Sequence, residues 1–181
     1  MNHTARLTAA QETSLAIAAA VVTANAYYIH PIIALVADHF GVSHARIGLV
    51  PALNQLALAV GIFLLLPLGD RFSNRRLTIA FATGQTVSLA VMTFAQGFTL
   101  FVLGSTLLGF FTIAPYLLPA YASKRVAPER LGQVTAKLTA GVILGILVAR
   151  VGAGVVAEHF GWRAVYWAAT GLMLAVTLAL P

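Results

Sequence analysis

The feature that most constrains this chain is a series of six long apolar runs joined by short polar connections. The runs cover residues 15–37, 47–68, 77–95, 98–122, 138–156 and 164–180. A helix needs about 20 predominantly apolar residues to cross the hydrocarbon core of a bilayer. Barrel strands would instead alternate in polarity over about ten residues. We therefore predict an all-α membrane protein, with a six-helix transmembrane bundle over residues 15–181 and a short N-terminal segment at residues 1–14.

Composition excludes the main alternative classes. Hydrophobic residues make up 60% of the chain and charged residues only 9%, whereas charged residues make up about 25% of a soluble domain. The net charge of +6 does not indicate a nucleic-acid partner, because the basic residues lie in short clusters between apolar runs. The chain has no cysteine, so disulfides and thiolate metal sites are excluded.

The basic residues also predict an orientation. With the N-terminus in the cytoplasm, eight basic residues fall on the inside and two, Arg46 and Arg163, on the outside, as the positive-inside rule requires. The eight are Arg6, Arg71, Arg75, Arg76, Lys124, Arg125, Arg130 and Lys137. We expect a multi-pass protein of the inner (cytoplasmic) membrane, with the lipid bilayer as its first partner.

Small residues recur every fourth position along the fifth run. Gly141, Gly145, Ala149 and Ala153 would lie on one helix face. Such a face allows the backbone of a neighbouring helix to approach closely. We interpret this pattern as helix packing.

A charged sequence stands between the second and third runs. It reads Pro67-Leu-Gly-Asp-Arg-Phe-Ser-Asn-Arg-Arg76. It resembles the cytoplasmic loop signature of the major facilitator superfamily, G-x-x-x-D-R-x-G-x-R-R. The matching residues are Asp70, Arg71, Arg75 and Arg76, while Leu66 and Ser73 occupy the two glycine positions. The resemblance implies that these residues form a conformational loop, in which the acid contacts a helix end in the opposite half of the protein.

The resemblance extends over essentially the whole chain. Pro128-Glu-Arg-Leu-Gly132 and Phe160-Gly-Trp-Arg163 look like common loops of the superfamily. In detail the chain is most similar to bacterial arabinose-efflux-permease-like members, near the drug:proton antiporters. Two features depart from the antiporters: Ser105 stands where many have an arginine, and their glycine-proline signature is absent, with Arg150 near its place.

The superfamily fold has twelve helices in two halves, with the substrate between them. The resemblance therefore implies that this chain is the N-terminal half of a secondary transporter that moves a small-molecule substrate. It also implies coupling to protons, in the direction of efflux. The implied partner is a missing C-terminal six-helix half or a second copy of the chain.

Arg150 is the most informative residue, because a charge within a span must face protein or water. It either binds an anionic group of the substrate or a coupling carboxylate, or it has a structural role with carbonyls as partners. Asn25 and Tyr28 share a helix face, and with Asn54 they are candidates for substrate contact or for interhelical hydrogen bonds. His30 is a candidate proton relay or an interfacial residue.

The spans lack the parts of an enzyme. The five acids are Glu12, Asp38, Asp70, Glu129 and Glu158, and none lies at a predicted midplane. No metalloprotease or hydrolase motif is present, so we expect no enzyme activity, cofactor or metal. Two further readings stay open, namely a non-transporting six-helix protein that partners or regulates a transporter, and a homodimeric half-transporter.

Overall fold

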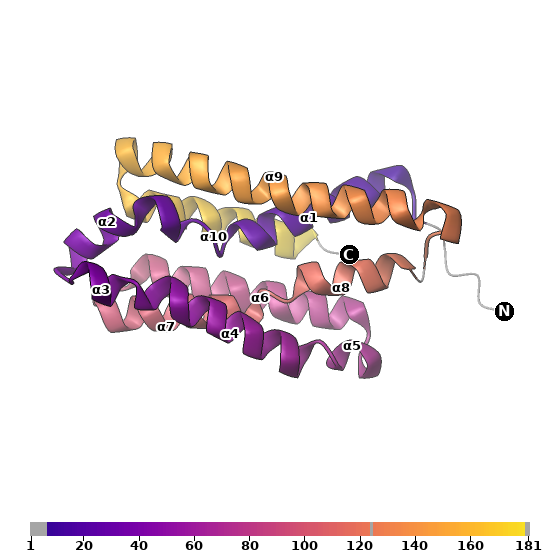
Figure 1. Ribbon diagram of the computed structural model, residues 1–181, viewed down its shortest axis with the longest axis horizontal. Coiled ribbons are helices and arrows are strands. Elements are labelled where there is room, and N and C mark those ends of the chain that lie inside the picture. The colour runs from indigo at the N-terminus through magenta and orange to yellow at the C-terminus, as the bar shows by residue number, and fades with distance from the viewer. Residues whose placement is uncertain (1–6, 124, 180–181) are drawn as a thin grey trace.

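The computed structural model describes residues 7–123 and 125–179, which form a bundle of long helices lying side by side (Figure 1). Within these ranges the secondary structure is helical and contains no strand, which confirms the predicted all-α class. The helices are α1 (Ala9–Ala24), α2 (Ile29–Phe40), α3 (His44–Ile47), α4 (Leu49–Leu65), α5 (Leu68–Arg71), α6 (Asn74–Phe94), α7 (Phe98–Phe111), α8 (Ala114–Ser123), α9 (Pro128–Phe160) and α10 (Trp162–Ala179).

These helices line up as six rods, and each rod contains most of one apolar run. The rods are, in order, α1 with α2, α3 with α4, α6, α7 with α8, α9, and α10. Among the described residues, the first five rods are long and apolar enough to cross a membrane. The short helix α5 connects the second rod to the third. The prediction of a six-helix membrane fold is confirmed.

The rods pack in two sets of three. Helix α1 packs most extensively on α9, and α4 packs equally extensively on α7. The third rod contacts both the fourth and the sixth, and so joins the two sets. Figure 1 shows α1, α9 and α10 on one side of the bundle and α4, α6 and α7 on the other.

Glycines bring the most closely packed rods together. A Cβ atom added at Gly145 of α9 would lie 2.5 Å from the carbonyl oxygen of Ala20 in α1. A Cβ atom at Gly109 of α7 would lie 2.1 Å from the carbonyl oxygen of Asn54 in α4. Both distances are too short for a side chain, so these backbones touch, as small residues permit in membrane helices.

The fifth rod is longer than the apolar run that predicted it. Helix α9 starts with Pro128 in its first turn and ends at Gly161, whose φ of +80° suits glycine. Its 33 residues span about 50 Å, well beyond the ~30 Å hydrocarbon core. The additional first turns pack on α1, where Arg130 forms an ion pair of 2.9 Å with the buried carboxylate of Glu12.

The end of the bundle opposite the N-terminus is closed by aromatic side chains. Phe101, Trp162 and Tyr166 are buried there and meet edge to face, with ring centroids 5.4–5.9 Å apart. Arg163 donates a hydrogen bond of 2.8 Å to the carbonyl oxygen of Ala95, where α6 has just ended. This end is therefore held by both apolar packing and a charge-assisted hydrogen bond.

Candidate functional site

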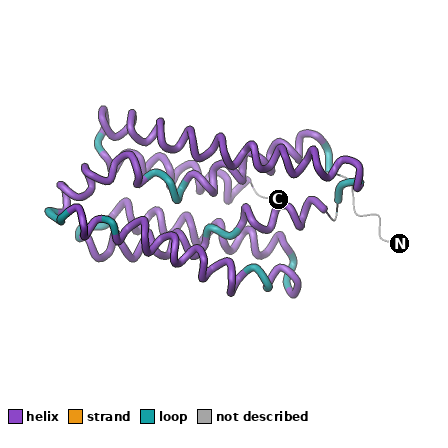
Figure 2. Tube along the Cα trace, in the orientation of Figure 1, coloured by secondary structure: helices purple, strands orange, loops and turns teal. Residues whose placement is uncertain are grey.

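Two of the six rods are interrupted near the middle, and proline explains both interruptions. The first rod breaks between α1 and α2, and the fourth breaks between α7 and α8 (Figure 2). Pro31 and Pro115 follow the two breaks. A proline removes the N–H group that would bond the carbonyl four residues earlier. The carbonyls released in this way belong to Tyr27 and Phe111.

Nearby backbone N–H groups donate hydrogen bonds to both carbonyls. The oxygen of Tyr27 accepts the backbone N–H of His30 at 3.4 Å and lies 3.3 Å from the Nδ1 atom of the His30 ring. The oxygen of Phe111 accepts the backbone N–H of Ile113 at 2.8 Å. The two released carbonyls therefore have donors within their own turns, and the two breaks lie in the first and fourth rods.

Arg150 lies beside the break in the first rod. Its guanidinium carbon is 5.6 Å from the ring centroid of Tyr27, within cation–π range. The ring of Tyr27 stacks on that of His30, with centroids 5.6 Å apart. We call these three residues the Arg150 cluster.

The Arg150 cluster lies deep within the span. Arg150 is ten residues before Phe160, the last residue of α9, and at 1.5 Å per residue this is about 15 Å. Half of a ~30 Å hydrocarbon core is the same depth. Arg150 is exposed in the isolated chain. An exposed guanidinium at this depth has to face water or another protein element rather than lipid.

A second polar group connects the two breaks through the interior. Asn25, at the end of α1, donates to the side-chain oxygen of Gln85 at 3.2 Å. The Gln85 amide in turn donates to the hydroxyl of Thr112, at the break in the fourth rod, at 2.6 Å. All three side chains are buried. We call Asn25, Gln85 and Thr112 the Gln85 bridge, because Gln85 of α6 bonds a residue at each of the two breaks.

The remaining candidates within the spans contact other helices. Asn54 is buried and donates to the carbonyl oxygen of Ser105 at 2.7 Å, which joins the second rod to the fourth. Tyr28 is half-buried and lines an apolar groove of about 370 Å³ formed with α9 and α10. The structure therefore places Arg150 and His30 together, and it places Asn25, Tyr28 and Asn54 away from them.

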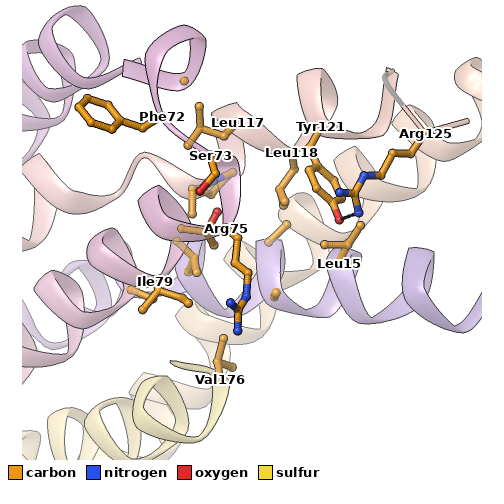
Figure 3. Close-up of a pocket in the computed structure, with 18 of the residues that line it drawn as sticks. Leu15, Phe72, Ser73, Arg75, Ile79, Leu117, Leu118, Tyr121, Arg125 and Val176 are labelled. Atoms are coloured by element: carbon orange, nitrogen blue, oxygen red, sulfur yellow. Dashed lines mark hydrogen bonds between the residues drawn. The ribbon is translucent and has the colours of Figure 1, made fainter. Parts of the chain in front are cut away.

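The charged loop lies at the end of the bundle that also holds the N-terminus. Arg71, Arg75 and Arg76 are all exposed there, and the side chain of Asp70 lies outside the described residues. Arg71 and Arg75 line a cavity of about 730 Å³ between α1, α6, α8 and α10 (Figure 3). Among the described side chains, no group of three or more histidines and acids is placed to hold a metal ion.

Sequence reasoning missed several of these residues. Tyr27 and Thr112 are not among the residues that the sequence marks as site candidates. One signal was available: a proline inside an apolar run frees a carbonyl four residues earlier, which marks Tyr27 and Phe111. The partners across helices depend on rod rotation, which periodicity alone does not give.

Sequence comparison identifies the family of the chain. The Major Facilitator Superfamily profile matches residues 15–181. The chain belongs to this superfamily of membrane transporters.

Curated relatives lie in two groups of bacteria. The uncharacterized transporter YgaY of Escherichia coli, strains K12 and O157:H7, is 33% identical over 166 residues, which are 92% of this chain and 42% of the relative. The "Probable transporter SCO4007" of Streptomyces coelicolor is 30% identical over 165 residues, which are 91% of this chain and 38% of the relative. The chain thus spans about two fifths of the length of the curated relatives it matches.

Proposed function

We propose that this chain forms one wall of the substrate site of a secondary active transporter, which moves a small molecule across the cytoplasmic membrane. The observation that carries the proposal is the Arg150 cluster beside a broken helix at mid-span. Substrate sites of secondary transporters lie near the midplane and are built from discontinuous helices. The exposed face of Arg150 is the face that a second six-helix unit would cover. That unit is a C-terminal half or a second copy of this chain.

In this proposal Arg150 binds an anionic group, either on the substrate or on a coupling carboxylate of the second unit. The aromatic ring of Tyr27 keeps the guanidinium in place through the cation–π contact. Asn25 and Asn54 hold the helices of the wall through their interhelical hydrogen bonds. Tyr28 lines the groove formed with α9 and α10.

The proposed coupling ion is the proton, and the proposed direction is efflux. All five acids of the chain lie outside the middle of the spans, so a coupling carboxylate would come from the second unit. His30 is the titratable side chain that stacks within the Arg150 cluster, and we assign it the proton relay. The direction follows from the resemblance of the chain to efflux permeases.

We further propose that the N-terminus is cytoplasmic. The end of the bundle with the N-terminus carries the exposed Arg71, Arg75, Arg76 and Arg125, while the opposite end carries Arg46 and Arg163. We call the first the basic end. The positive-inside rule places it in the cytoplasm. The loop of Asp70, Arg71, Arg75 and Arg76 then lies where it can contact the second unit during the transport cycle.

Transport by the full-length protein tests this proposal. Proteoliposomes that contain a trapped pH-sensitive dye are given an imposed pH gradient, and either glucuronate as a membrane-impermeant anionic probe or arabinose as a neutral one. We expect probe-dependent proton flux that Arg150→Gln abolishes and Arg150→Lys retains in part, because lysine keeps the charge but not the planar fork. Arg46→Gln is the matched control, because it removes a cation from the end of the bundle opposite the basic end.

Unchanged flux in Arg150→Gln, with normal folding, would remove Arg150 from the mechanism. Flux that does not respond to the pH gradient would count against proton coupling. The number of copies of this chain in each purified particle separates the two possible second units, because a second copy gives two and a C-terminal half gives one.

A further inference from the structure

The cavity lined by Arg71 and Arg75 lies at the basic end, apart from the Arg150 cluster. It occupies about 730 Å³ and is enclosed by α1, α6, α8 and α10 together with the segment from Gly69 to Ser73. A volume of this size is typical of sites that hold small organic ligands. No contact described above for Arg150, Tyr27 or His30 involves its walls.

The rim of this cavity is cationic. Arg71, Arg75 and Arg125 are exposed lining residues. Figure 3 shows the guanidinium of Arg75 pointing into the cavity, and that of Arg125 lying against Tyr121. The Arg125 carbon is 4.3 Å from the Tyr121 ring centroid, and Arg125 also donates a hydrogen bond to the Tyr121 hydroxyl. That double contact holds one cation at a fixed place on the rim.

The interior of the cavity is apolar. Small and branched side chains of α1 and α10 form one wall, and α8 forms the other; the residues are Leu15, Ala18, Ala19, Val22, Val176, Leu117 and Leu118. The described lining side chains include no acid. Cations at the mouth and an apolar interior match a ligand with an anionic head and a hydrocarbon tail.

We propose that this cavity binds an anionic phospholipid of the cytoplasmic leaflet. The phosphate lies among Arg71, Arg75 and Arg125, and an acyl chain enters between α1, α8 and α10. Basic pockets between membrane helices on the cytoplasmic side are suited to anionic headgroups, and that leaflet is rich in them. The cytoplasmic location rests on the orientation proposed above, whereas the binding itself does not depend on it.

The apolar interior favours a lipid over a soluble phosphate compound. A soluble anion would satisfy the rim and leave the wall of α1 and α10 without an apolar partner. An acyl chain covers that wall and gains the free energy of burying apolar surface. A phospholipid therefore contacts both the cationic rim, through its phosphate, and the apolar interior, through an acyl chain.

Native mass spectrometry of the full-length protein in detergent tests the proposal. The probes are phosphatidylglycerol and phosphatidylcholine with the same acyl chains, with glycerol 3-phosphate as a soluble competitor. We expect the protein to bind phosphatidylglycerol at least about fivefold more tightly than phosphatidylcholine. We expect Arg71→Gln and Arg125→Gln each to lower the affinity for phosphatidylglycerol about fivefold, the contribution of one arginine near an anionic headgroup.

Two further variants separate charge from shape. Arg46→Gln removes an exposed cation at the opposite end, beside Phe98, and should leave lipid binding unchanged. Ala18→Leu keeps all the arginines but fills the apolar wall, and should weaken phosphatidylglycerol binding severalfold. Elution as a single monodisperse peak checks the fold of each variant. If Arg125→Gln fails to fold, the exposed Arg71→Gln still tests the charge.

Three results would overturn the proposal. The first is equal binding of the two lipids by the unaltered protein. The second is a folded Arg71→Gln variant that binds phosphatidylglycerol as tightly as Arg46→Gln does. The third is displacement of the lipid by an equal concentration of glycerol 3-phosphate, which would make the cavity a site for soluble anions.

Discussion

Replacing Gln85 with methionine should lower the free energy of unfolding of the bundle, because this one residue of the third rod bonds both broken rods. Methionine is similar in size and is apolar, so the change keeps the packing and removes the polar groups. The side-chain amide of Asn25 would lose its oxygen acceptor at 3.2 Å, and the hydroxyl of Thr112 would lose its donor at 2.6 Å. Both broken rods would then lose their side-chain hydrogen bonds to Gln85 at once.

The expected cost follows from these two bonds. Interhelical side-chain hydrogen bonds in membrane proteins contribute about 0.6 kcal/mol each on average and at most about 1.7 kcal/mol. A buried donor left without an acceptor costs a further ~1–3 kcal/mol. Asn25 keeps only a weak contact, 3.4 Å to the sulfur of Met173. We therefore expect the free energy of unfolding to fall by about 2 kcal/mol.

Unfolding of the purified protein in mixed micelles, titrated with a denaturing detergent and followed by circular dichroism, measures this change. The matched control is Gln96→Met, because Gln96 is exposed and bonds only the nearby carbonyl of Phe94 at 3.4 Å. The control should change stability by less than about 0.5 kcal/mol. The double variant of Asn25→Leu and Gln85→Met should lose less than the sum of the single variants, because the two residues share a bond.

A Gln85→Met variant that is as stable as Gln96→Met would refute the reasoning. Additive effects of Asn25→Leu and Gln85→Met would refute the bridge in particular. In that case the two breaks would be held by packing alone.

Other contacts give further predictions, measured by the same unfolding experiment. Gly145→Val should cost about 1–3 kcal/mol because its Cβ would collide with the first rod, whereas Gly152→Val, with open space around it, should be tolerated. Arg130→Gln should cost about 1 kcal/mol or more by leaving the buried carboxylate of Glu12 without its ion pair; equal stability would show that water replaces the guanidinium. Arg163→Gln should cost about 1 kcal/mol through its lost hydrogen bond to a backbone carbonyl, and should shift tryptophan emission because the guanidinium covers an indole ring.

The number and class of the helices could be predicted from the sequence because the bilayer imposes a length. Each apolar run is near the spanning length of a helix. Only helices and closed barrels satisfy their backbones in lipid, and continuous apolar runs do not show the alternation of barrel strands. The start of the fifth rod could not be read in the same way. Polar and charged residues interrupt the sequence between Pro128 and Lys137, and the helix there is held by contacts with α1, including the hydrogen bond from Lys137 to Thr13.

The arrangement of the site was harder to predict. Spacing shows that Asn25 and Tyr28 share a face, but the turn between α1 and α2 changes the rotation of the residues that follow. As a result Asn25 bonds Gln85 inside the bundle, while Tyr28 lies in the groove beside α9. Arg150 was recognisable because a charge within an apolar run is expensive, but its contact with Tyr27 depends on how two distant rods pack.

The ion pair between Glu12 and Arg130 also bears on how the bundle moves. Together with the glycine contacts, it fixes α1 to α9 along most of the length of α1. The two helices therefore form one rigid unit. A tilt of roughly 10° about the middle of the ~50 Å helix would carry its tip by about 4 Å. A change of angle between α1 and α2 would fall on the turn at residues 25–28, which includes Tyr27 of the Arg150 cluster.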